Sequence, residues 1–305
     1  MNRYILRRGL HSLIALLTLL ILVFFLSRLT GDPTNLFLPM DASLEQRQEF
    51  AERHGFNDPI HVQFWHYVLD LARFDFGESL FQGRPAIDAV LGAFPVTLKL
   101  AAVTMVLALG LAVLIGSVAA YRPHGLFDRI ASLLSVLGAS TPDFWIAIVA
   151  ILVFAASLGL LPTSGMGTVW HWIMPVGVLM LRPLGLLTQV VRAAMIGVLN
   201  SAYVKTARAK GAGTNRIIFI HGLRNAMLAV ITVAGDQAAA LINGAVIVET
   251  VFGWPGIGNL MISAIKQRDF AVLQASILVT ALAIFLMNIL IDYAYTRLDP
   301  RIRDS

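Results

Sequence analysis

Six long apolar stretches constrain the fold of this chain more than any other feature. The hydrocarbon core of a bilayer is about 30 Å thick, and a helix needs roughly 20 apolar residues to cross it. Six stretches meet this length: Gly9 to Leu29, Val96 to Ala120, Ala131 to about Leu158, about Trp172 to Val191, about Met227 to Val248, and about Val272 to Tyr295. The sequence therefore predicts an all-α integral membrane protein with six transmembrane helices.

The composition agrees with a chain whose main solvent is lipid. Hydrophobic residues make up 57% of the 305 residues and charged residues only 13%, whereas soluble domains carry about 25% charged residues. Cysteine is absent, which excludes disulfides, thiolate metal sites and cysteine catalysis. A net charge of +5 can indicate a nucleic acid or an anionic membrane as partner. Here the positive residues are expected to be concentrated on one side of the membrane, so we expect membrane lipid and not nucleic acid as a partner.

The distribution of charge predicts the orientation of the spans. The N-terminus, segments 121–130 and 192–228, and the C-terminus hold 14 of the 23 Lys and Arg residues. The segments on the opposite side (30–95, 159–171 and 249–271) hold 6 of them, and 30–95 alone holds ten of the 18 acidic residues. Because short cytoplasmic loops are enriched in Lys and Arg, we expect both termini and the 192–228 loop to lie in the cytoplasm.

The long external segment carries signals for short helices. Ser43 and Gln46 form a capping-box pattern, and Gly55 would end that helix. A second amphipathic helix is predicted from helical spacing of Ile60, Phe64, Tyr67, Val68 and Leu71. The chain then divides into an N-terminal transmembrane helix (1–30), an external helical insertion (31–95), a core of five transmembrane helices (96–295) and a cytoplasmic tail (296–305).

A basic loop rich in small residues separates the fourth and fifth spans. Small side chains around Ala207 would let a short helix approach a partner surface closely, and Gly211 or Gly213 would supply a left-handed stop. Tyr203, Ala207 and Lys210 would share one face of that helix. The alternative is that the basic residues of the loop only fix the topology.

Several motifs occur in a fixed order along almost the whole chain. They are Gly31-Asp32-Pro33, Phe74 to Leu80, Thr97-Leu98, Tyr203 to Gly211, Leu223 to Ala226, Glu249 to Phe252 with Pro255 to Gly258, and Leu298 to Arg301. In these motifs the chain resembles the permease subunits of ATP-binding-cassette (ABC) importers, and among them the dipeptide, oligopeptide and nickel type. The resemblance implies the type I importer permease fold and a bacterial inner (plasma) membrane protein that forms half of a translocation pathway.

The resemblance also implies partners. They are a second permease subunit, expected to be non-identical, two cytoplasmic ABC ATPase subunits that bind ATP and Mg, and an external substrate-binding protein. The residues expected to couple to the ATPases are Tyr203, Thr206, Ala207, Arg208, Ala209, Lys210, Gly211, His221, Leu223, Arg224 and Asn225. The docking candidates for the binding protein are Glu249, Phe252, Trp254 and Pro255.

Four polar residues within or beside the spans are candidates for the translocation path. An ionisable side chain at membrane depth is costly and suggests function. Arg182 lies between Pro175 and Gly185. We expect it to meet a carboxylate or other anion in the translocation cavity, or else to form a structural ion pair with Asp143, Asp236 or the partner subunit. Asp143 either lines the path or caps a helix that restarts after Pro142. Asp236 and Asn243 share one helical face and line either the cavity or an interface with the second permease.

The chain lacks the motifs of an enzyme. A phosphate-binding loop needs a Gly-Lys pair, and none occurs, so ATP hydrolysis is expected only in the partner subunits. We expect no catalytic, cofactor-binding or metal-binding residue in this chain. The alternatives to an importer permease are an ion-coupled secondary transporter, which would need an inverted repeat that the sequence does not clearly contain, and a non-transporting membrane scaffold.

Overall fold

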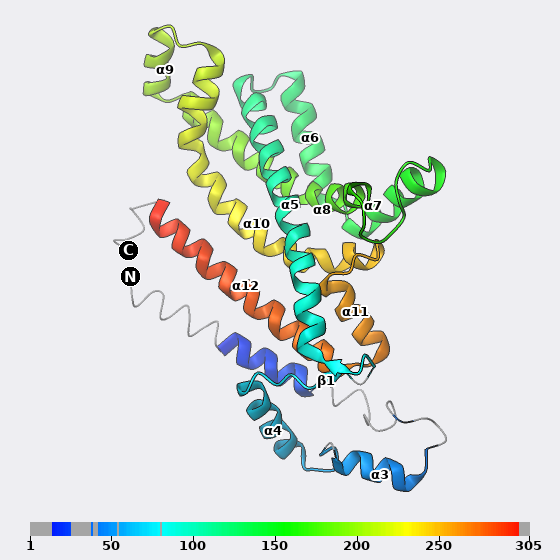
Figure 1. Cartoon of the computed structure of the whole chain (residues 1–305). Helices are drawn as coiled ribbons and strands as arrows, with labels where there is room; N and C mark the ends of the chain where they lie inside the picture. The colour runs from blue at the N-terminus through cyan, green and yellow to red at the C-terminus, as the bar shows by residue number, and fades with distance from the viewer. Residues whose placement is uncertain (1–13, 26–37, 39–41, 54, 80, 299–305) are drawn as a thin grey trace. The chain divides into compact units, whose positions relative to one another are not determined.

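The fold is described by a computed structural model that covers residues 14–25, 38, 42–53, 55–79 and 81–298 (Figure 1). Among these residues, four helical segments are long and apolar enough to cross a membrane: α5 (Ala86–Tyr121), α8 (Val169–Leu199), Arg216–Val251, and the Phe270–Ile291 part of α12 (Phe270–Leu298). The third of these joins a π-helix, η2 (Arg216–Gly222), to α10 (Leu223–Val251).

The third predicted span, 131–158, is bent at Pro142, where a helix restart is one of the predictions. The helix begins earlier, as α6 (Leu126–Ser140), and the chain then turns by 102° into α7 (Asp143–Ala150) and the π-helix η1 (Ile151–Ser157). Pro142 explains the break, because proline disfavours helical backbone in the residue before it and has no N–H to donate. The helix does restart at Asp143, but the capping position is Pro142 and no side chain caps it.

The first predicted span contains an apolar helix over Ile14–Phe25. Phe24 at its end is buried, with ring centroids 5.2 Å from Phe64 and 5.3 Å from Tyr67. The remainder of the predicted N-terminal span, the Gly31-Asp32-Pro33 motif and the end of the tail (299–305) lie outside the described residues.

The 31–95 segment contains the two predicted helices, α3 (Leu44–Arg53) and α4 (Ile60–Ala72). The capping box is confirmed, because the Ser43 N–H donates to Gln46 Oε1 at 2.9 Å and the Gln46 N–H to Ser43 Oγ at 3.2 Å. Gly55 follows α3 with a φ of 66°, as expected of a left-handed stop.

A short hairpin and a capped helix complete this part of the chain. Strands β1 (Glu78–Ser79) and β2 (Arg84–Pro85) pair antiparallel. The Ser79 hydroxyl donates to Asp269, which is buried and accepts the N–H of Val272 in the first turn of α12 at 3.2 Å. One carboxylate therefore both caps α12 and holds the hairpin.

The described residues form two compact units. The first contains residues up to Pro95 together with Leu260–Phe285, and the second contains Val96–Asn259 with the residues after Leu286. The predicted five-helix core is thus divided, since part of α11 (Ile257–Gln267) and most of α12 group with the N-terminal residues.

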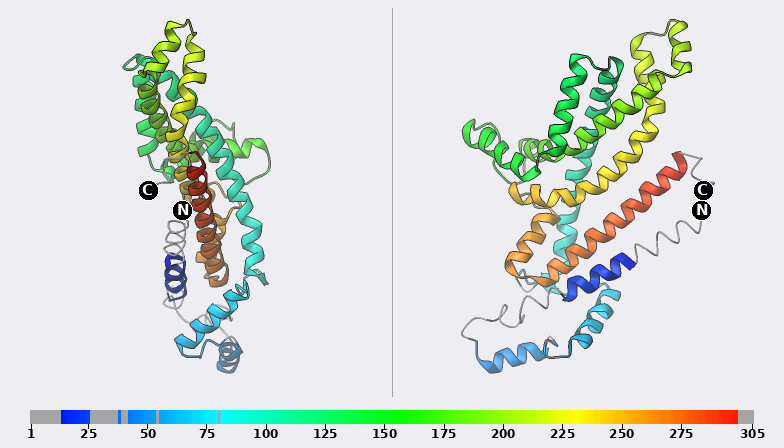
Figure 2. Two further views of the ribbon diagram at one scale, coloured as in Figure 1. Left: turned by 90° about the vertical axis from the view of Figure 1, so that its left-hand side faces the viewer. Right: turned by 180° about the vertical axis from the view of Figure 1, so that it is seen from behind.

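Helix α8 is central to the second unit, where it packs against α6 and α10 (Figure 2). Close approach to α6 depends on Gly185, because a Cβ there would lie 2.3 Å from the carbonyl oxygen of Ser135. Small residues at helix interfaces allow this packing in membranes.

Candidate functional site: coupling helix and polar pocket

The predicted loop helix exists as α9 (Ala202–Ala209), between the end of α8 and the start of η2 (Figure 1). Val204 is fully buried and anchors α9 to the rest of the unit. The residues on its other sides are exposed, and they include Tyr203, Thr206, Arg208 and Ala209. The helix therefore exposes a surface of small and basic residues, while the buried side chain of Val204 attaches it to the rest of the unit.

The end of α9 is a Schellman motif centred on Gly211. Its φ is 81°, its N–H donates to the Arg208 carbonyl at 3.0 Å, and the N–H of Ala212 donates to the Ala207 carbonyl at 3.1 Å. This confirms the prediction of a left-handed stop and assigns it to Gly211. Gly213, the alternative position, does not have a positive φ.

Two hydrogen bonds tie this region to neighbouring helices. Asn225 Nδ2, in α10, donates to Tyr203 Oη at 2.7 Å. Thr214, beyond α9, lies 3.1 Å from the hydroxyl of Tyr121 at the end of α5. The first bond joins two of the predicted coupling residues, which are 22 positions apart in sequence. A side-chain hydrogen bond therefore joins α9 directly to α10.

The other predicted coupling residues gather at the same end of the unit. Lys210, Gly211 and Arg224 are exposed, whereas Ala207, His221 and Leu223 are half-buried. Within the described part of the chain, no ion pair occupies the basic side chains of Arg208, Lys210 or Arg224. These cations are available to a partner.

A buried ion pair near this end is not evident from the sequence. Arg192 of α8 donates from Nε and Nη2 to the two oxygens of Asp128 in α6, and the second bond is 2.7 Å long. Asp128 is buried and also accepts the backbone N–H of His124. The sequence shows each residue at the edge of a span, but the pairing depends on how α6 and α8 pack. The pair fixes the register of the two helices.

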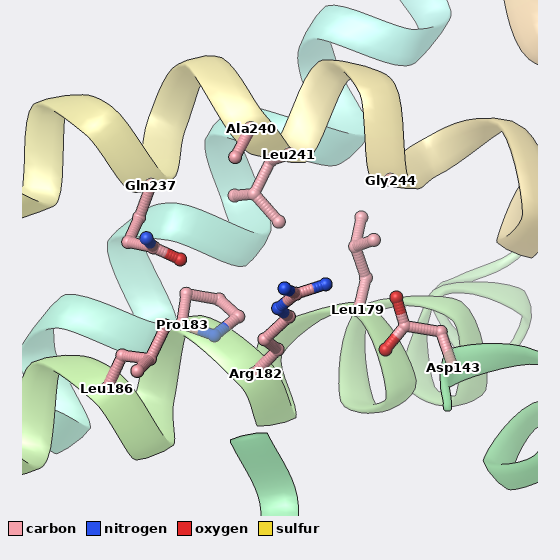
Figure 3. Close-up of a pocket in the computed structure, with 9 residues that line it drawn as sticks. All are labelled: Asp143, Leu179, Arg182, Pro183, Leu186, Gln237, Ala240, Leu241 and Gly244. Atoms are coloured by element: carbon pink, nitrogen blue, oxygen red, sulfur yellow. The ribbon is translucent and has the colours of Figure 1, made fainter. Parts of the chain in front are cut away.

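A polar pocket of about 160 Å³ lies between α7, α8 and α10 (Figure 3). Arg182 and Asp143, both predicted path residues, line it from α8 and from the start of α7. Gln237, a polar residue next to Asp236 on the predicted fifth span, lines it from α10. The apolar part of the lining comes from Leu179, Pro183, Leu186, Ala240, Leu241 and Gly244.

The other two predicted path residues do not line this pocket. Asp236 and Asn243 are exposed on α10, but the pocket-facing positions of that helix are Gln237, Ala240, Leu241 and Gly244. The face of α10 that lines this pocket is a helical stripe at 237, 240, 241 and 244, which is rotated by about 100° from the face through Asp236 and Asn243. Their alternative role at an interface stays a prediction.

Three of the four predicted docking residues are buried, which corrects their assignment. Glu249, Phe252 and Trp254 have at most 1% of their surface exposed, and only Pro255 is exposed. Trp254 packs edge-on against Trp172 with ring centroids 4.7 Å apart. Buried inside the chain, these three side chains cannot form a surface for a binding protein. Docking at Pro255 stays a prediction.

Glu249 instead lies in a cradle of hydrogen bonds. Its carboxylate accepts the Thr97 hydroxyl at 2.6 Å and the N–H of Gly258 at 2.8 Å, while Thr97 Oγ1 accepts the N–H of Ile257 at 2.8 Å. Gly256 and Gly258 leave the space for it, because a Cβ at Gly256 would lie 2.1 Å from Glu249 Oε1. One hydrogen-bonded cluster, called the joint below, thus connects three of the sequence motifs: Thr97-Leu98, Glu249 and Pro255 to Gly258.

Comparison with known proteins identifies the family. Residues 112–304 match the model of the family described as "Binding-protein-dependent transport system inner membrane component", and residues 1–101 match the N-terminal model of such membrane components. The chain is 37% identical over 314 residues to the oligopeptide transport system permease protein AppB of Bacillus subtilis, covering 99% of each chain. It is 35% identical over 304 residues to the glutathione transport system permease protein GsiC of Escherichia coli (strain K12), again covering 99% of each.

Solved structures agree at the level of the fold. The inward-facing MetNI methionine ABC transporter matches with a TM-score of 0.59 and 14% identity, over 69% of this chain and 96% of that one. An amino acid ABC transporter matches with a TM-score of 0.52 and 16% identity, over 69% and 94%. The type I importer permease fold predicted from the motifs is confirmed, and the chain belongs to the family of inner membrane components of binding-protein-dependent transport systems.

Proposed function

We propose that the chain is the permease subunit of an ATP-driven importer for peptides or peptide-like solutes, and that α9 is its coupling helix. The observation that carries the proposal is the construction of α9. It is short, anchored by buried Val204, stopped by Gly211 and bonded to α10 through Tyr203 and Asn225. A rigid, exposed element of this kind can receive a motion and pass it into a membrane helix.

The partners follow from the absence of a motor in this chain. No phosphate-binding loop is present in the sequence, so two ATPase subunits would bind ATP and Mg and close against α9. A second permease subunit would supply the other half of the pathway, and an external binding protein would deliver the solute. Relatives named for oligopeptide and glutathione transport support a peptide-like solute.

The orientation that this mechanism needs is the one that the charges favour. The cytoplasmic ATPases reach α9 only if the 192–228 segment and both termini lie in the cytoplasm, and the excess of Lys and Arg in these segments supports that side. The 31–95 insertion would then face the exterior, where the binding protein approaches.

The test is a bulky side chain on the exposed surface of α9. In the assembled transporter, Ala209→Trp should weaken the seating of the ATPases about tenfold, which corresponds to about 1.4 kcal/mol of lost binding energy. Peptide uptake by reconstituted vesicles should fall accordingly, while the unfolding temperature of the permease stays unchanged because Ala209 is exposed.

Ala72→Trp is the matched control, since Ala72 is an exposed alanine at the end of α4. It should leave uptake and ATPase binding unchanged. Full uptake by the Ala209→Trp transporter would contradict the coupling role of α9, and uptake that persists without any ATPase subunit would contradict the importer itself.

A further inference from the structure

Resting on the proposed function, we propose that the pocket between α7, α8 and α10 is a binding site for a short zwitterionic peptide, with Arg182 holding the free carboxylate and Asp143 the free ammonium group. The site has one cationic and one anionic side chain in a pocket of about 160 Å³. Pockets for drug-sized ligands have volumes of roughly 300–1,000 Å³. The volume therefore suits a very short peptide or one section of a longer chain.

Arg182 and Asp143 interact electrostatically, but they do not form an ion pair. Within the described residues, Arg182 and Asp143 make no hydrogen bond with each other or with any other side chain, and no ion pair within 4.0 Å joins them. In Figure 3 the guanidinium and the carboxylate both extend into the space between α8 and α10. Arg182 is exposed and Asp143 is half-buried, so both charged groups are accessible to a ligand that enters the pocket.

Arg182 lies next to a proline inside helix α8, where the regular hydrogen bonding of the helix is interrupted. Pro183 follows it and has no N–H, so the carbonyl of Leu179, one turn earlier, has no helical donor at position 183. Leu179 and Pro183 both line the pocket. A carbonyl without its helical donor is an acceptor for a ligand N–H, as expected where an irregular helix lines a cavity.

The chemistry of the three polar side chains matches the groups of a peptide. A guanidinium binds a carboxylate through two parallel N–H donors, and a carboxylate accepts an ammonium group. Gln237, which faces them from α10, can both donate to and accept from a peptide bond. An isolated anion would satisfy Arg182 only and leave Asp143 repelled, so a solute with both charges fits the lining better.

The experiment measures ligand binding by the assembled transporter in lipid nanodiscs, with the external binding protein left out so that the solute meets the permease directly. The probes are dialanine, N-acetyl-dialanine and dialanine amide, and the readout is the thermal unfolding midpoint, which rises when a ligand binds the folded state. Dialanine should raise it. Each capped probe lacks one charge and should bind about tenfold more weakly, the usual loss for one charge-assisted hydrogen bond.

The variants assign the two charges. Arg182→Gln should abolish the preference for dialanine over its amide, and Asp143→Asn the preference over the N-acetyl form. Arg182→Lys retains a cation and should keep the first preference in weakened form, which separates lost recognition from misfolding. Asp236→Asn is the control, because Asp236 is exposed on α10 outside the pocket, and it should behave as the parent protein does.

Equal stabilisation by all three probes, no stabilisation by any, or unchanged preferences in the Arg182→Gln protein would each overturn this proposal. ATP-driven uptake with the binding protein present is scored separately. Uptake without the dialanine preference would reject the pocket alone, whereas the dialanine preference without ATP-driven uptake would support the pocket and reject the importer.

Discussion

At the scale of single residues, the most constrained group is the buried carboxylate of Glu249, which Thr97 joins to the start of α11. The Thr97 hydroxyl donates to Glu249 and accepts from the N–H of Ile257. Thr97→Val preserves the shape but leaves both groups buried without that partner. We expect a loss of about 1–3 kcal/mol in the free energy of unfolding.

Denaturant unfolding of the purified permease in detergent measures this loss. Thr97→Ser is the matched control, since it keeps the hydroxyl, and it should restore most of the stability. If the valine variant were as stable as the serine variant, the hydroxyl would not be what holds the joint together, and the cradle would be a consequence of packing alone.

Glu249 also shows which single-residue features cannot be predicted from the sequence. Glu249 belongs to a recognisable motif, and its position near the end of a span suggests a docking surface. Its burial depends on Gly256 and Gly258, whose missing side chains create the space, and on Thr97, which is 152 positions away. A sequence motif does not show whether its residues contact other residues of the same chain or a partner protein.

At the scale of elements, local signals predict the helices well. The Ser43 and Gln46 capping box and the Gly211 stop act over a few residues, so the sequence around them is sufficient. Pro142 marks the break after Ser140 in the sequence. The size of the bend, 102°, cannot be predicted, because the apolar residues continue on both sides of the break. The pocket face of α10 is hidden because Asp236 and Gln237 are adjacent polar residues, and only packing against α8 decides between them.

The stop at the end of α9 gives a prediction at this scale. Gly211→Ala places a side chain at a φ of 81°, which should destabilise the end of α9 by about 1 kcal/mol. Hydrogen exchange of the α9 amides should then speed up about fivefold, the factor that corresponds to such an energy. ATPase coupling should weaken in parallel.

Gly213→Ala is the control for this change, because Gly213 has ordinary backbone geometry and open space around its Cα. It should leave both exchange and coupling as they are. Faster exchange in both variants would mean that the whole segment, and not its left-handed stop, determines the order of α9.

At the scale of the whole molecule, the chain is a permease that, as proposed, receives motion at α9. From there the Tyr203–Asn225 bond leads into α10, and α10 lines the polar pocket together with α7 and α8. The family follows from motifs spread over nearly the full chain, which is why it is accessible from the sequence. The pocket lining depends on the packing of α7, α8 and α10, which no motif encodes.

The most direct test of coupling through α9 uses the absence of cysteine from the chain, because a single introduced cysteine is then a unique reactive group. Thr206→Cys, on the exposed surface of α9, is combined with cysteines on the surface of the ATPase subunits in the assembled transporter. We expect a cross-link between the permease and an ATPase whose yield changes when ATP is bound. Absence of any such cross-link in a transporter that still imports its solute, or labelling of the introduced cysteine from outside intact cells, would contradict the coupling role of α9.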